Sequence, residues 1–286
     1  MSEIFSSTAR IATIAFAVTS MVAVGLGHSF KEIIYPLRNI QPVVRVLVAN
    51  FVLVPMLAFA VGQLLSLAQP LKAGLMLIGM GAGAPFLIKL TQHAELDVAL
   101  SATSLIILLP ASVIYMPLMV PLALPDARVN AAAIAMPLVM TMLLPLVIGL
   151  AINEASASWL ERVRTVLSRI ASVMLIVLIA TTLLANFDRV VNLFGSSAII
   201  AAILVIGGAF LIGYALGGHD QENRGVLALA TAQRNIAAAT VVATQDFSYP
   251  GTLVMVITSS LVGLAMLFPA ARALRSRVAR RRLVNP

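Results

Sequence analysis

Long apolar runs separated by short polar segments extend along almost the whole chain. A helix needs ~20 mostly apolar residues to cross a membrane, and nine runs reach this length. They are too long for the strands of an outer-membrane barrel, in which apolar and polar residues alternate over about 10 positions. The pattern therefore predicts an all-α, polytopic membrane protein with nine transmembrane helices. The predicted helices cover approximately residues 9–29, 40–65, 71–94, 97–124, 130–153, 166–186, 194–217, 224–244 and 249–273.

Two of the predicted helices are interrupted near their centres by residues that suit a helix poorly. Glycines and Pro85 interrupt the third, and Gln233, Arg234 and Asn235 interrupt the eighth. Backbone at membrane depth can be irregular only where it is buried in protein or lines a wet cavity. Matched broken helices in two halves of a chain are a sequence indication of a transporter's binding site. We therefore expect function to centre on these two breaks, with a hinge at Gly83 and Pro85.

The two broken helices also occupy corresponding places in the two halves of the chain. Aligning Gly74 with Gly225 sets Gly83 opposite Arg234. Because the two helices are five apart in the predicted order, they should run in opposite directions, as the halves of an inverted repeat do. The alignment predicts two broken helices of opposite direction within a single transmembrane domain over residues 1–286. Its parts are a first repeat over about residues 9–124, a second over about 130–273, and a cytoplasmic basic tail over 274–286.

Composition excludes several other classes of protein. Apolar residues make up 60% of the chain and charged residues 10%, and the mean hydropathy is +1.03, which leaves no room for a separate soluble domain. The chain has no cysteine, so disulfides and thiolate chemistry are excluded. His28, His93 and His219 lie at loop edges without the spacing of metal ligands. Neither a nucleophile–base set nor a nucleotide motif is visible. We expect no metal site, no cofactor and no enzymatic activity.

Basic residues gather in alternate loops, and this asymmetry predicts the orientation of the chain. One set of loops and the C-terminus hold thirteen of the 19 Lys and Arg residues, and the opposite set holds four. The remaining two, Lys89 and Arg234, lie inside predicted helices. The N-terminus should therefore lie outside and the C-terminus in the cytoplasm, in the cell inner (plasma) membrane. The same distribution accounts for the net charge of +8 without nucleic acid, so the expected partner is the lipid bilayer.

Lys89 and Arg234 are the main candidates for chemistry inside the membrane. All eleven acidic residues fall in loops or tails, and a charge at mid-bilayer costs at least ~2.5–3.5 kcal/mol. One interpretation is that both cations face a wet cavity that accepts an anion. The alternatives are that Lys89 extends its ammonium towards the cytoplasmic surface, and that Arg234 binds carbonyls freed at the break.

Other polar residues lie at a similar depth and have two interpretations each. Gln233, Asn235, Thr231 and Asn50 could contact a substrate or satisfy unwound backbone, and a hydrogen bond between helices would by itself explain Asn50. Ser101, Thr103 and Ser104 can bond to the backbone of their own helix.

Four segments spread over nearly the whole chain carry a family resemblance. They are Met21–Gly27, Asn50-Phe51 with Pro55, Gly83-Ala84-Pro85 leading to Asp97-Val98-Ala99-Leu100-Ser101, and Gln233-Arg234-Asn235. Together they resemble the bile acid:sodium symporter family. The resemblance implies a panel domain packed on a core domain, in which the third and eighth helices cross at their unwound centres. It also implies nine or ten spans, with the first helix of the ten-span form missing here.

The departures from the family pattern concern its sodium ligands. The family holds sodium with a Ser-Asn pair in the first broken helix, where this chain has Leu87 and Ile88. A glutamate in the second broken helix falls at Ala230, and a glutamine falls at Arg234. Sodium needs a cage of oxygens, and this chain has alkyl groups and cations instead. We expect Lys89 and Arg234 to replace the bound cations, and we do not transfer the family's sodium sites.

The resemblance and the two breaks together predict a secondary active transporter that moves a small organic anion by alternating access, independently of sodium. The expected substrate contacts are Lys89, Arg234, Gln233, Asn235, Asn50 and Thr231. One alternative is a sodium-coupled organic anion symporter with rearranged ligands. Another is a membrane receptor or assembly protein on the same fold that does not transport. The substrate, the coupling ion, the direction of transport and the oligomeric state are left open.

Overall fold

A computed structural model describes residues 2–31, 40–124, 131–155, 158–185, 197–246 and 250–284. These residues form helices and contain no strand, in agreement with the predicted all-α class. The helices are α1 (Ser2–Gly25), α3 (Ile40–Val48), η2 (Ala49–Leu53), α4 (Val54–Leu64), α5 (Gln69–Met80), α6 (Phe86–His93), α7 (Val98–Ala123), α8 (Ala131–Leu138), η4 (Val139–Leu143), α9 (Leu144–Asn153), α10 (Leu160–Ala185), α12 (Ser197–Leu216), α13 (Gln221–Ala232), α14 (Ile236–Asp246) and α15 (Pro250–Val284).

Seven helical stretches among the described residues are long and apolar enough to cross a membrane. They include α7, α12, the continuous series α3–η2–α4, and α13 together with α14. The other two predicted spans coincide with α5 plus α6, which are 12 and 8 residues long, and with α10, which carries charges in its first turns. The total of nine spans therefore stays a prediction. The backbone of α15 is helical to Val284, so residues 274–284 continue the last helix.

Both predicted breaks are present. Helix α5 ends at Met80 and α6 begins at Phe86, whereas α13 ends at Ala232 and α14 begins at Ile236. Each first half is 12 residues long, and each is followed by an extended residue whose N–H bonds to the fourth residue before it. These residues are Gly81 (φ −78°, ψ 97°) and Gln233 (φ −77°, ψ 104°).

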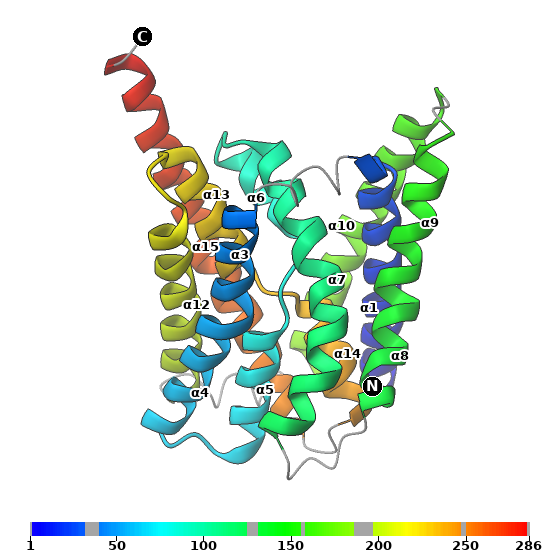
Figure 1. Cartoon of the computed structure of the whole chain (residues 1–286). Coiled ribbons are helices and arrows are strands. Elements are labelled where there is room, and N and C mark those ends of the chain that lie inside the picture. The colour runs from blue at the N-terminus through cyan, green and yellow to red at the C-terminus, as the bar shows by residue number, and fades with distance from the viewer. Residues whose placement is uncertain are drawn as a thin grey trace.

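These matched helix ends correct the sequence alignment by one position. If Gly81 corresponds to Gln233, then Gly83 corresponds to Asn235 and not to Arg234. In Figure 1, α6 and α13 lie towards the end of the molecule that carries the C-terminus, and α5 and α14 lie towards the end that carries the N-terminus. The two broken segments therefore run in opposite directions through the molecule.

The helices form two groups, which we call the panel and the core. The panel consists of α1, the series α8–η4–α9, and α10, because α1 packs along both α9 and α10. The core contains the two broken segments together with α3–η2–α4, α7, α12 and α15. Figure 1 shows α1, α8 and α9 on one side of the molecule and α3, α4, α12 and α13 on the other. A small buried cluster, which includes Phe16, Leu175 and Ala237, joins α1, α10 and the start of α14.

A π-helical turn precedes a proline in the second predicted span. Pro55 has no N–H, so it cannot bond to the carbonyl of Phe51 four residues earlier. The hydroxyl of Tyr115 donates to that carbonyl instead, at 2.7 Å. The wide turn η2 also contains Asn50, which is buried. Its position against the second break is described below.

Candidate functional site

Side chains from other segments bind the unwound backbone of the first break. The hydroxyl of Ser112 on α7 accepts a hydrogen bond from the N–H of Ala82 at 2.9 Å and donates to its carbonyl at 2.8 Å. The carbonyl of Gly81 accepts from the N–H of Asn235, also at 2.9 Å. The Asn235 amide donates to the carbonyl of Gly83 at 3.2 Å. The two breaks are therefore in direct contact, as the family resemblance implies.

Only glycine fits at position 83. Its φ is +77°, a conformation that other residues rarely adopt. A Cβ atom there would also lie 2.6 Å from the backbone nitrogen of Leu109 on α7. The expected hinge role of Gly83 and Pro85 stays a prediction, but the glycine is required by the backbone conformation and by the close approach of α7.

The guanidinium of Arg234 is enclosed by oxygen atoms at the contact between the two breaks. Its Nε donates to the carbonyl of Ile78 at 2.9 Å, and Nη2 donates to the carbonyl of Gly79 at 2.6 Å. Nη1 donates to Oδ1 of Asn50 at 2.8 Å and to the carbonyl of Thr231 at 2.9 Å. The residue is only 4% exposed. This geometry matches the interpretation in which Arg234 binds freed carbonyls, because α5 ends at Met80 and leaves its last carbonyls without helical partners.

Asn50 and Thr231 support this arginine from two sides. The Asn50 amide nitrogen donates to the carbonyl of Val46 at 3.0 Å and to the Thr231 hydroxyl at 3.4 Å. Both residues are fully buried. The hydrogen bond between helices that was one interpretation of Asn50 is therefore present, and no side-chain atom of Asn50 is left for a substrate in this conformation.

Gln233 differs from its neighbours. The structure gives its side-chain amide no hydrogen bond to another described residue, although the residue is only 5% exposed. It lines two recesses of about 10 Å³ each. One of them also contains Phe16, Pro85 and Phe86, which line a larger cavity as well. Arg234 lines both recesses as well. The recess that shares Phe16, Pro85 and Phe86 with the larger cavity forms the inner end of that cavity, next to the contact between the breaks.

The larger cavity has a volume of about 280 Å³ and lies between the panel helices α1 and α10 and the core helix α6. Lys89 lines it, and its ammonium donates to the hydroxyl of Ser172 on α10 at 2.6 Å. Arg234 does not line it. Its guanidinium binds the carbonyls at the end of α5, and the residue lines the neighbouring recess that contains Gln233. The expectation that both cations face one cavity stays a prediction.

Sequence reasoning missed most of the polar residues in this cavity. Arg164, Ser168 and Ser172 line it at intervals of four along α10, and they therefore share one face of that helix. Ser20 and Gln92 add polar groups from α1 and α6. The interval of four was visible in the sequence. It was overlooked because the predicted helix began at residue 166 and left Arg164 in a loop.

The charge of the cavity is positive. None of its lining residues carries a carboxylate. The nearest recorded acid is Glu161, which pairs with Arg164 at 3.1 Å, so part of the charge of Arg164 is balanced. Lys89 has no carboxylate partner among the described residues. The cavity thus presents an ammonium group with a single neutral partner, together with several hydroxyl and amide groups.

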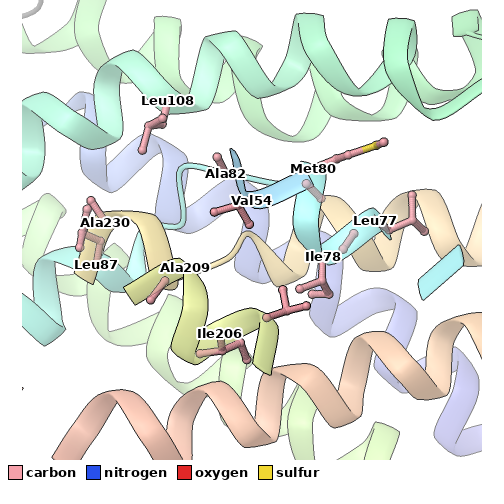
Figure 2. Packing of buried hydrophobic residues seen from close by; sticks show 14 of the residues in the cluster. Val54, Leu77, Ile78, Met80, Ala82, Leu87, Leu108, Ile206, Ala209 and Ala230 are labelled. Atoms are coloured by element: carbon pink, nitrogen blue, oxygen red, sulfur yellow. The ribbon is translucent and has the colours of Figure 1, made fainter. Parts of the chain in front are cut away.

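Two positions that the resemblance aligns with the family's sodium ligands, Leu87 and Ala230, are apolar and buried. Leu87 and Ala230 are each 1% exposed and belong to the main buried hydrophobic cluster. Figure 2 shows them side by side, where α6 contacts α13. Ser101 donates to the carbonyl of Val98 in its own helix at 2.8 Å, which matches its structural interpretation. No group of three or more His, Asp or Glu side chains gathers in the part of the chain that the structure describes. The expected absence of a metal site stays a prediction.

The fold and the site together define a class of protein. The chain is a multi-pass membrane protein of apolar helices, in which two broken segments bind each other beside a positively charged cavity. The model of the sodium bile acid symporter family matches residues 14–193, more than half of the chain. The chain therefore belongs to this family, which suggests a membrane transporter. A comparison with curated proteins finds no match.

Proposed function

We propose that the protein is a secondary active transporter that moves a small organic anion through the cavity between panel and core. The observation that carries this proposal is the ammonium of Lys89 in a cavity without a lining carboxylate. A hydrogen bond from an ammonium group to a bound anion is stronger than a hydrogen bond between two neutral groups. Gln92 supplies a further polar contact, and Phe16 and Phe86 supply an apolar wall.

The size of the cavity narrows the substrate class. Ligand pockets have volumes of about 300–1,000 Å³, and this cavity, at about 280 Å³, lies just below the lower limit. It favours a small carboxylate over a substrate with a steroid skeleton. Lys89 takes the role of the anion contact. Gln233, whose amide has no partner among the described residues, orients the substrate at the inner end.

Arg234 has a different role in this proposal. Its guanidinium has four oxygen partners, three of them carbonyls, at the contact between the breaks. Cages of carbonyl and amide oxygens are typical of bound cations. We infer that Arg234 is a tethered cation that replaces a bound sodium ion, and that transport is independent of sodium. The buried apolar side chains of Leu87 and Ala230 support this inference, because neither offers an oxygen.

The Lys89–Ser172 hydrogen bond suggests how an anion could alter the conformation. Lys89 belongs to α6 of the core and Ser172 to α10 of the panel, and the ammonium joins them across the cavity. An anion that binds the ammonium of Lys89 in place of the Ser172 hydroxyl weakens this link between panel and core. Panel and core can then move relative to each other, as alternating access requires. The orientation, the inner-membrane location, nine spans and the inverted repeat are parts of the same proposal.

Uptake into proteoliposomes tests the proposal. The purified protein is reconstituted, and a panel of labelled small mono- and dicarboxylates is offered, with neutral and cationic compounds of similar size as controls. We expect saturable uptake of at least one carboxylate and none of the controls. The rate should be the same with sodium or choline as the external cation. A sodium dependence above about three-fold rejects the role of Arg234 as a substitute cation. Saturable binding without any flux identifies a receptor instead.

A further inference from the structure

A second, larger cavity lies within the core and shares no residue with the panel–core cavity. Its volume is about 400 Å³, and it lies between α3, α7, the start of α13 and the loop that joins α12 to α13. Its polar residues are Gln41, Arg45, Ser104, His219 and Asn223. No panel helix contributes to it. The proposed relative movement of panel and core therefore does not depend on this cavity, and its occupant need not be the transported anion.

Arg45 is the central residue of this core cavity. It has no ion pair and no hydrogen bond to another described residue, and it is half-buried. Its guanidinium lies against the loop, because a Cβ atom on Gly218 would lie 3.1 Å from Nη1 of Arg45. Gly218 has a φ of +83° and closes the turn there. A guanidinium held beside a cavity without a carboxylate partner is ready to bind an anion with two parallel hydrogen bonds.

The remaining polar groups of the cavity add further donors. The side chains of His219 and Asn223 have no hydrogen-bond partner among the described residues, and both line the cavity. Two acidic residues, Asp220 and Glu222, adjoin the lining residues in sequence. The carboxylate of Asp220 accepts from the backbone N–H of Asn223 at 2.8 Å and caps α13. None of the lining residues is acidic. Several donors around one space suit a phosphate group, whose non-bridging oxygens accept hydrogen bonds.

The rest of the lining is apolar and lies next to the surface that faces lipid. Val46, Leu100, Leu216 and Val226 complete the cavity. On the same helix as Arg45, Val44 is 47% exposed and Ile40 is 72% exposed, as expected for side chains in contact with lipid tails. The charge asymmetry of the loops predicts that this end of the molecule is cytoplasmic, where basic pockets between helices bind the head groups of anionic lipids.

From these observations we propose that the core cavity binds a phosphate group through Arg45, with His219 and Asn223 as further donors. A phospholipid head group and a free phosphate share this chemistry. The Gly218 turn keeps Arg45 in place, and the cavity serves as a binding site separate from the transport route.

Ligand-dependent thermal shifts of the purified full-length protein test this proposal. The probes are inorganic phosphate, dioctanoyl-phosphatidylglycerol, and dioctanoylglycerol, which has the same acyl chains without phosphate. We expect saturable stabilisation by at least one phosphate-bearing probe and none by dioctanoylglycerol. In Arg45→Gln, the half-saturating concentration should rise at least about ten-fold, because a charge-assisted bond is lost. Arg169→Gln is the matched control, since Arg169 is exposed and lines neither cavity; its response should equal that of the parent protein.

The outcomes separate the two sources of phosphate and also decide the proposal. A shift with phosphatidylglycerol alone identifies a lipid head group, and an equal shift with inorganic phosphate identifies a free phosphate. An unchanged half-saturating concentration in Arg45→Gln overturns the proposal, as does the absence of any saturable shift in the parent protein. If Arg45→Gln does not fold, Asn223→Ala replaces it. That change keeps the charge and should weaken binding about two- to ten-fold, and an unchanged affinity overturns the proposal equally.

Discussion

The contact between the two breaks and the panel–core cavity each contain one cation, and the two cations have opposite surroundings. Arg234 is 4% exposed and has four oxygen partners. Lys89 is exposed, has one recorded hydrogen bond, and lines a cavity of about 280 Å³. In the sequence the two residues are alike, because each is a cation inside an apolar run without an acidic neighbour.

The comparison teaches that depth alone does not make an intramembrane cation a binding residue. A charge in an apolar setting needs partners or water. The carbonyls at the end of α5 supply the partners for Arg234, and the cavity supplies space for water and ligand at Lys89. We therefore expect changes at Arg234 to affect stability and changes at Lys89 to affect substrate affinity.

The largest expected effect is a loss of folding stability in Arg234→Gln. Glutamine is shorter and has two donor hydrogens, so at least two of the four oxygen partners lose their hydrogen bonds. Each buried group left unpaired costs about 1–3 kcal/mol, so the loss of stability should be about 2–5 kcal/mol. The melting temperature in detergent measures this loss, and Arg169→Gln is the control. Among molecules that remain folded, substrate affinity should change by less than about three-fold.

This variant can also contradict the comparison. If Arg234→Gln keeps its melting temperature and loses affinity for an anionic substrate, then Arg234 is the anion contact that the sequence suggested. Both quantities should be measured on the same preparation, so that a loss of folded protein is not mistaken for a loss of affinity.

The second-largest expected effect is a loss of substrate affinity in Lys89→Gln. Removal of the ammonium takes one charge-assisted hydrogen bond from the bound anion, worth about 1.5–3 kcal/mol. Affinity should fall about ten-fold to over a hundred-fold, while the melting temperature stays unchanged. Lys72→Gln is a matched control, because the ammonium of Lys72 also has a single neutral partner, Gln63 at 2.9 Å, and lies outside the cavity. If the two variants behave alike, Lys89 does not contact the substrate.

Much of this fold could be predicted from the sequence because membrane helices follow hydropathy closely. The predicted ranges 40–65 and 97–124 agree with α3–η2–α4 and α7 to within one residue. The two breaks were also predicted, since glycines, Pro85 and Gln233-Arg234-Asn235 disrupt their helices visibly. The contact between the breaks was implied by the family resemblance. The sequence left two interpretations of Arg234: it binds carbonyls freed at the break, or it faces a cavity that accepts an anion. The hydrogen bonds of its guanidinium favour the first.

The rest could not be predicted, because it depends on which helices face each other. The partners of Arg234 come from three separate segments, and one of them, Asn50, belongs to the π-helical turn η2. The pairing of Lys89 with Ser172 joins residues 83 positions apart. A single sequence, considered without an alignment, contains no signal for such a pairing. The one-residue error in the repeat alignment has the same origin, because the equivalent helix ends are defined by backbone geometry.

A smaller effect is expected for Ser112→Ala, which extends the comparison to a neutral residue. Ser112 satisfies both backbone groups of Ala82 in the first break, so its loss should cost about 1–3 kcal/mol and leave affinity unchanged. Ser104→Ala is the control on the same helix, because that hydroxyl bonds only to the carbonyl of Leu100 in its own helix. The difference in melting temperature between the two variants measures how much the hydrogen bonds of Ser112 to the first break contribute to stability. An equal response would show that Ala82 finds another partner.

The smallest effect is expected for Ser172→Ala, and its sign is the opposite of the others. In the substrate-free protein the ammonium of Lys89 donates to the Ser172 hydroxyl, and an anion must displace that partner. A neutral hydrogen bond contributes about 0.5–1.5 kcal/mol, so its removal should raise affinity by about two- to ten-fold. Ser168→Ala is the control, because Ser168 lines the cavity one helical turn away and only its carbonyl is engaged, by the Ser172 hydroxyl. Equilibrium binding of the carboxylate found in the uptake panel measures both variants. A fall in affinity for Ser172→Ala would mean that this hydroxyl binds the substrate directly, and the link between α6 and α10 would then not compete with the anion for Lys89.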